Sequence, residues 1–285
     1  SSGLPIIHHG KCVCELPPSH RFPMGKFPRV FHFLLKDQVI TEKQVWIPEI
    51  ASEDVLSCVH SEDYLKNFIN GTINEAEQRR TGFPWGGTVL AAEVALQRGL
   101  ACSTAGGTHH AFPNYGSGFC LLNNLAVAAK YLMNKSPSKR KILIVDLDVH
   151  QGDGTAFIFK EEPYVFTFSV HCGKNFPLFK QQSDLDVSVE DGLEDEEYLS
   201  TNSHLPGVLE TFRPDLVLYD AGVDPHWEDE LGRLRLTDQL YQRDLYVLRA
   251  AVSRGIPVAT VIGGGYSDID KLALRHSIVH RAATK

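Results

Sequence analysis

Short apolar runs alternate with segments of helical periodicity through most of this chain, and this alternation limits the fold more than any other feature. Apolar runs of strand length occupy residues 99–107, 141–147, 164–170, 215–222 and 256–265. Apolar residues at helical spacing occupy residues 86–99, 121–133, 194–212 and 236–255, with Pro206 expected to kink or interrupt the third segment. Strands that alternate with helices pair in parallel. We therefore predict one α/β domain over residues 1–285, with a mostly parallel sheet covered by helices on both faces. Residues 1–85 are irregular and rich in Pro, His and Phe.

Composition narrows the class of protein. The 285 residues are 43% hydrophobic and 22% charged with a formal net charge of −7, which is ordinary for a globular protein and gives no basic face for nucleic acid. No apolar run is long enough to span a membrane. Six cysteines without C-x-x-C spacing indicate reduced thiols and an intracellular, soluble protein. Nucleus, cytoplasm and an organelle such as a plastid are not distinguished, and a homo-oligomer remains open.

The stretch DLDVHQGDG follows the apolar run ILIV and carries the strongest signal for a metal site. Asp148 and His150 are two residues apart, so in an extended segment both side chains point to the same side. Asp224 follows another predicted strand, and the carboxyl ends of parallel strands meet at one edge of a sheet. Three protein ligands that leave a position for water are typical of catalytic zinc, although this oxygen and nitrogen set also suits ferrous iron.

A histidine pair, His109 and His110, lies past the end of another predicted strand. Histidine can take a proton from water or give one to a departing amine. Asp146 and Asp153 are available to orient the two imidazole rings.

Three aromatic residues complete the predicted site. Tyr266 follows three glycines, which permit close approach to a ligand, and its phenol can donate to a forming oxyanion. Phe119 and Phe176 are placed to form two walls of a narrow slot at the same sheet edge.

These residues together resemble the histone deacetylase family, which has the arginase-deacetylase fold. The resemblance rests on the stretches GGTHHA, GSGFCLLNN, VDLDVHQGDGT, FSVH, KNFP, DAGVDP and GGGYSD, which occur in the order of the family between residues 106 and 268. HRFPMGKF, at residues 20–27, resembles the family's early loop. Gln151 stands where many members carry a second histidine after the metal-binding one, which is similar to the class IV branch.

The resemblance implies a zinc-dependent lysine deacylase that acts on acyl-lysine in a protein or peptide, with acyl length undecided. It assigns zinc to Asp148, His150 and Asp224, and catalysis to His109, His110, Asp146, Asp153 and Tyr266. Gly118, Phe119, Phe176 and Gly264 correspond to substrate-binding positions. A structural potassium ion would take the side chains of Asp146 and Ser169. The segment 71–83 does not reveal the family's peptide-gripping aspartate.

Three alternatives remain. A two-metal ureohydrolase such as arginase would need an acid where Gly222 stands and another near Gln151 and Gly152. A scaffold that binds acylated ligands without turnover would not need every catalytic position filled. A hydrolase of acetylpolyamines or other small amides would share the chemistry and differ in its early loop. Cys12 and Cys14, near His8, offer a weaker metal-binding spacing.

Overall fold

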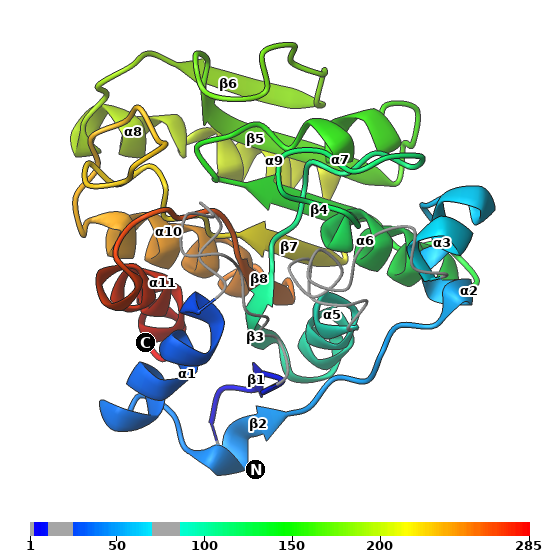
Figure 1. Ribbon diagram of the computed structural model, residues 1–285, viewed down its shortest axis with the longest axis horizontal. Helices are drawn as coiled ribbons and strands as arrows, with labels where there is room; N and C mark the ends of the chain where they lie inside the picture. The colour runs from blue at the N-terminus through cyan, green and yellow to red at the C-terminus, as the bar shows by residue number, and fades with distance from the viewer. Residues whose placement is uncertain (1–2, 11–24, 70–85) are drawn as a thin grey trace.

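A single parallel sheet organises the protein (Figure 1). The computed structural model describes residues 3–10, 25–69 and 86–285. Within these ranges eight strands form one sheet in the order β2-β1-β3-β8-β7-β4-β5-β6, and every pair is parallel. The strands are β1 (Ile6–Ile7), β2 (Val45–Trp46), β3 (Leu100–Gly106), β4 (Ile142–Asp146), β5 (Val165–Cys172), β6 (Leu185–Val189), β7 (Leu216–Asp220) and β8 (Val258–Ile262). The predicted α/β class is confirmed.

Helices cover both faces of this sheet, which explains why its central strands are apolar throughout. On one face Leu143 and Val145 of β4 pack in a core with α10 and α11; on the other, Ile142 and Ile144 pack with α5 and α6. The helices are α1 (Lys26–Lys36), α2 (Glu53–Leu56), α3 (Glu62–Ile69), α5 (Gly87–Arg98), α6 (Asn124–Lys135), α7 (Asp153–Ile158), α8 (Asp195–Thr201), α9 (His204–Phe212), α10 (Leu240–Val252) and α11 (Ile269–Ala283), with a 3₁₀ turn at Glu42–Gln44.

The predicted interruption near Pro206 occurs, but four residues earlier. Helix α8 ends at Thr201 and α9 begins at His204, so Pro206 lies in the first turn of α9. A proline costs little there because the first-turn N–H groups have no partner within the helix. The proline therefore starts a helix here and does not break one.

The N-terminal segment is more ordered than its sequence indicated. Helix α1 buries Val30 and Leu34 in a small core with β1 and α11, and β1 joins β2 to β3. Three features named in the sequence lie outside the described residues: Cys12 and Cys14, the segment 71–83, and residues 20–24 of the early loop. No described helix is long and apolar enough to cross a bilayer.

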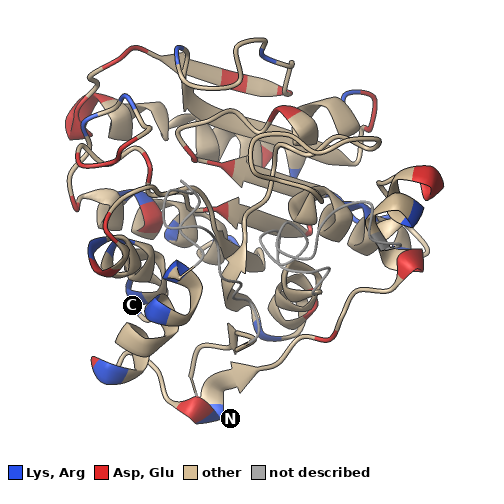
Figure 2. Cartoon of the chain, viewed as in Figure 1, with Lys and Arg blue, Asp and Glu red and all other residues tan. Residues whose placement is uncertain are grey.

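All strands end at the same edge, and this edge gathers the candidate site. Asp146 closes β4 and Asp220 closes the adjacent β7, where the two residues are register partners. Figure 2 shows acidic residues at these strand ends, whereas acidic and basic residues mix over the outer helices.

Candidate metal centre

Asp148, His150 and Asp224 converge at the ends of β4 and β7. Nδ1 of His150 lies 3.1 Å from Oδ1 of Asp148 and 3.0 Å from Oδ2 of Asp224. All three side chains are buried, and their ligand atoms lie within 4.8 Å of one another. The same-side geometry expected for Asp148 and His150 is therefore present, and the group can hold a divalent metal ion.

Backbone N–H groups fix the two carboxylates. Val149 donates to Oδ1 of Asp224 at 2.8 Å, and His150 donates to Oδ1 of Asp148 at 2.9 Å. Gly264, in the loop after β8, donates to Oδ2 of Asp148 at 2.5 Å. Three chain segments thus hold the site in place before any ion binds.

Protons occupy this site when it holds no metal ion. The pKa of His150 rises to about 10, because hydrogen bonds and charges from Asp148 and Asp224 outweigh burial, which lowers it. The pKa of Asp224 rises to about 7 through burial and the charge of Asp148. A bound cation would replace these protons, since metal ligands must be deprotonated.

The histidine pair stands beside this group, and each ring is held by a carboxylate. Asp146 accepts from Nδ1 of His109 at 2.6 Å, and Asp153 accepts from Nδ1 of His110 at 2.7 Å. Nε2 of His109 then faces Oδ1 of Asp148 at 3.8 Å. The structure thus pairs His109 with Asp146 and His110 with Asp153, as the sequence predicted.

The two rings differ in their protonation. The pKa of His109 is raised well above its ordinary value: burial lowers it, but the charges of Asp146 and Asp148 prevail. The pKa of His110 falls to about 4 through burial and the charge of His109. Neighbours that share charge in this way titrate as a pair.

Asp220 was missed by the sequence analysis. Both of its carboxylate oxygens are buried without a hydrogen-bond partner among the described residues, and Oδ2 lies 3.8 Å from Nδ1 of His109. His109, Asp148 and Asp220 form a second group that could hold an ion. However, Nδ1 of His109 is already bonded to Asp146. The sequence feature that could have identified Asp220 is an acidic residue at the end of a predicted buried strand, as at Asp146.

Lys26 was also missed, because it lies in the segment judged irregular. It is 2% exposed at the start of α1, and its ammonium group donates to the carbonyl oxygen of Gly263 at 3.1 Å. Burial lowers its pKa to about 8, and the charges of Asp224 and Asp148 oppose that shift. Lys26 therefore places a positive charge beneath a cluster of carboxylates.

Tyr266 is buried and is held through its backbone. Asp229 accepts from the N–H of Tyr266 at 2.8 Å, and the carbonyl oxygen of Tyr266 accepts from Glu230 at 2.8 Å. Burial and the charges of Asp224 and Asp148 raise the pKa of Tyr266 well above its usual range. Its hydroxyl therefore stays protonated and can donate.

The predicted wall residues lie around the histidine pair. The Phe176 ring packs edge-on against His110 with centroids 5.0 Å apart, and the Phe119 ring lies 6.0 Å from that of Tyr266. Gly118 has a φ of +52°, and a Cβ there would stand 2.6 Å from His110 and 2.8 Å from Phe176. Only glycine fits between these two rings.

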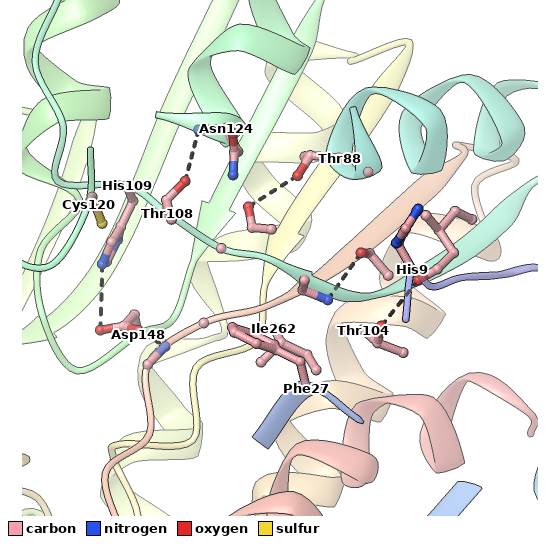
Figure 3. A pocket seen from close by; sticks show the side chains of 18 of the residues that line it. His9, Phe27, Thr88, Thr104, Thr108, His109, Cys120, Asn124, Asp148 and Ile262 are labelled. Carbon is pink, nitrogen blue, oxygen red and sulfur yellow. Dashed lines mark hydrogen bonds and ion pairs between the residues drawn. The ribbon is translucent and has the colours of Figure 1, made fainter. Parts of the chain in front are cut away.

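A cavity continues inward from this point (Figure 3). It runs from Cys120, His109 and Asp148 past Thr108 and Thr88 to Thr104 and His9, near the start of the chain. Its volume is about 70 Å³. This cavity borders the candidate ligand Asp148 and the histidine pair.

Asp146 and Ser169, the predicted potassium ligands, are register partners in β4 and β5. The Ser169 hydroxyl lies 2.8 Å from Nδ1 of His171. Asp146 in β4 thus lies between Ser169 in β5 and Asp220 in β7.

Comparisons with known proteins point to one family. The histone deacetylase domain family matches residues 20–282. An uncharacterized protein of Picosynechococcus is 50% identical over 99% of this chain and 98% of its own length. Histone deacetylase 2 of Arabidopsis thaliana is 30% identical over 91% of this chain and 73% of its own length. A crystal structure of an HDAC homolog complexed with SAHA has a TM-score of 0.81 and 25% identity, covering 100% of this chain and 85% of that one.

The fold and site define an α/β protein with a buried carboxylate–histidine group, suited to a divalent metal ion, at the strand ends. The chain belongs to the histone deacetylase domain family.

Proposed function

We propose that this protein is a zinc-dependent lysine deacylase that hydrolyses the amide of acyl-lysine. The observation that carries the proposal is one buried group, Asp148, His150 and Asp224, with two carboxylate-held histidines beside it. Gln151 after His150 supports a place in the class IV-like branch.

Asp148, His150 and Asp224 fit a divalent ion, since their donor atoms lie within 4.8 Å of one another and all three side chains are buried. When bound, such an ion supplies a Lewis acid for the acyl carbonyl and lowers the pKa of water. Zinc is the proposed ion, and ferrous iron suits the same donors. Asp146 and Ser169 are assigned to a structural potassium ion.

The histidine pair moves the protons. Asp146 and Asp153 accept from the Nδ1 atoms of His109 and His110, so the Nε2 atoms are left for the reaction. The ring of the pair that is unprotonated accepts a proton from the water that attacks the acyl carbon. The carbon–nitrogen bond then breaks, and the pair returns the proton to the lysine amine. Asp153 keeps His110 oriented for the same exchange.

Tyr266 and the aromatic walls act on the acyl group. The protonated phenol of Tyr266 donates to the oxygen that becomes negative during attack. Phe119, Gly118 and Phe176 form the slot for the lysine side chain, and Gly264 keeps the backbone close to the ligands.

The cavity of about 70 Å³ beside His109 and Asp148 is the proposed space for the acyl group. The acyl length that this cavity admits decides between acetyl-lysine and longer acyl-lysines as substrates. Rates on a panel of acyl-lysine peptides from acetyl to myristoyl test this directly.

The deciding experiment measures release from a fluorogenic acyl-lysine substrate before and after chelation, and after zinc is restored. We expect activity to vanish on chelation and return with zinc. Binding of the substrate with no metal-dependent release would favour the non-catalytic scaffold. Release from acetylpolyamine with none from acyl-lysine would favour the small-amide hydrolase.

The Tyr266→Phe variant tests the oxyanion role. We expect kcat to fall by about 10²–10³-fold with metal binding unchanged, because one donor to the oxyanion is lost. Tyr246→Phe is the matched control, since Tyr246 is 39% exposed on α10. Wild-type activity in the Tyr266 variant would contradict the assigned role.

A further inference from the structure

Residues 173–181, in the segment between β5 and β6, expose large apolar side chains beside the candidate slot. Phe176 is 45% exposed, Leu178 is 86% exposed and Phe179 is 82% exposed. The inner edge of this surface is the Phe176 ring, which packs against His110. We call Phe176, Leu178 and Phe179 the apolar platform.

The platform is anchored at its start. Asn175 is buried, and its amide donates to the carbonyl oxygen of Leu231 at 2.8 Å and accepts from the N–H of Arg233 at 3.0 Å. The ammonium group of Lys180 then donates to the carbonyl oxygens of Asn175, at 2.7 Å, and of Pro177. The Lys180 side chain thus closes the turn that carries Leu178, and the Asn175 side chain ties its start to Leu231 and Arg233.

Gln151 anchors the other end of the platform. It directly follows the candidate ligand His150 and is 1% exposed. Its amide donates to the carbonyl oxygen of Gln181 at 2.6 Å and accepts from the N–H of Gln181 at 2.9 Å. It also donates to Asp186 of β6 at 2.9 Å. The residue that marks the family branch therefore ties the metal-site loop to the platform.

A segment anchored in this way holds Leu178 and Phe179 in water at fixed positions. Contiguous exposed apolar residues in a fixed geometry are typical of binding surfaces. Phe176 belongs both to the candidate slot and to the apolar platform, so the platform continues directly from the slot.

We propose that the apolar platform is a substrate-docking surface that selects acyl-lysines flanked by apolar residues in a protein or peptide. The proposal rests on the lysine deacylase function proposed above. Leu178 and Phe179 act on substrate binding, and the chemistry at His109 and His110 does not depend on them.

The test compares wild type with the variant L178S/F179S. The substrates are an acyl-lysine with no flanking residues, a peptide with leucines on both sides of the acyl-lysine, and the same peptide with serines. We expect wild type to prefer the leucine peptide, and the variant to lose this preference through a roughly tenfold higher KM. The rate on the substrate without flanking residues should not change.

The variant I47S/I50S is the matched control, because Ile47 and Ile50 are 70% and 55% exposed and follow β2, at the opposite edge of the sheet. It should keep the leucine preference. Fluorescence anisotropy of both labelled peptides on zinc-loaded protein gives a reading that needs no turnover.

Equal binding of the two peptides by wild type, or an unchanged preference in L178S/F179S, would overturn the docking proposal. Loss of turnover of the unflanked substrate in the variant would also overturn it, because the residues would then support the site itself. Preferential peptide binding without any release by wild type would instead contradict the deacylase function.

Discussion

Gly264 lies against both carboxylates of the candidate metal centre. A Cβ at this position would stand 2.2 Å from Oδ2 of Asp224 and 2.7 Å from Oδ2 of Asp148. We predict that Gly264→Ala weakens zinc binding by about 10–100-fold, as changes next to metal ligands commonly do. Competition with a chelating dye measures the affinity.

Gly207→Ala is the control for this change. Nothing lies within 4 Å of a Cβ at Gly207, which is inside α9. Its zinc affinity should equal that of wild type, and its free energy of unfolding should rise by about 0.5–1 kcal/mol through helix propensity. Wild-type zinc affinity in the Gly264 variant would show that this contact is unimportant.

The protons on the ligands predict a pH dependence of metal binding. Without metal, His150 holds a proton below a pKa of about 10 and Asp224 holds one below about 7. Metal binding must release these protons, so affinity rises with pH. We expect about a tenfold gain per pH unit between pH 7 and pH 10, and a steeper gain below pH 7.

Isothermal titration in buffers with different ionisation enthalpies counts the protons. About one proton per zinc ion should appear at pH 8 and closer to two at pH 6. An affinity that does not change with pH would mean that the two ligands are not protonated in the metal-free protein.

Sequence reasoning found the residues whose chemistry is visible in a short stretch. Asp148 and His150 stand two apart, and the adjacent histidines follow a strand end, so both signals are local. Asp220 and Lys26 were missed. Asp220 closes a buried strand as Asp146 does, but the unpartnered state of its oxygens among the described residues is visible only in the structure. Lys26 reaches the site only because α1 packs against α11.

At the level of strands and helices, prediction succeeded where the hydrophobic pattern was long. The five predicted strands match β3, β4, β5, β7 and β8, and helices were placed where α5, α6 and α10 occur. Strands β1 and β2 have two residues each and carry no periodicity. Helices α1 and α11 bury apolar residues in one shared core. This packing joins the two ends of the chain, so it cannot be predicted from either segment alone.

The loop after β7 supports Tyr266 through Asp229. This carboxylate accepts from the N–H groups of Tyr266, Leu231 and Gly232, and it is 8% exposed. We predict that Asp229→Ala lowers kcat by about tenfold or more with KM little changed, because Tyr266 loses its position toward the oxyanion. Asp229→Asn should recover part of the rate, since its amide oxygen can still accept.

A double-mutant cycle identifies the route of this effect. If Asp229 acts only through Tyr266, then D229A in the Y266F background should cost little further activity. Independent, multiplicative losses would mean that Asp229 supports another part of the site. Zinc affinity measured on each variant shows whether the loss of activity comes instead from weaker metal binding.

A buried charged network connects the outer helices to the metal-site loop across the protein. Arg243 on α10 is 0% exposed; its guanidinium donates to Asp244 at 3.0 Å and to the carbonyl oxygen of Leu147 at 3.2 Å. Asp244 also accepts from the hydroxyl of Tyr219 in β7. Helix α10 thus holds Leu147, the residue before the candidate ligand Asp148. The geometry of the metal site therefore depends on the packing of α10 against the sheet.

Arg243→Met tests this dependence. It leaves Asp244 buried with only Tyr219 as a partner, so we predict a loss of about 3–5 kcal/mol in the free energy of unfolding. The double variant R243M/D244L removes the unpaired charge and should recover a large part of that loss. The exposed Arg235→Met should change stability by less than about 0.5 kcal/mol. Urea unfolding of the metal-free variants measures all three. If R243M and the double variant are equally destabilised, the loss comes from the packing of the Arg243 stem and its bond to Leu147, and the unpaired charge of Asp244 is not its cause.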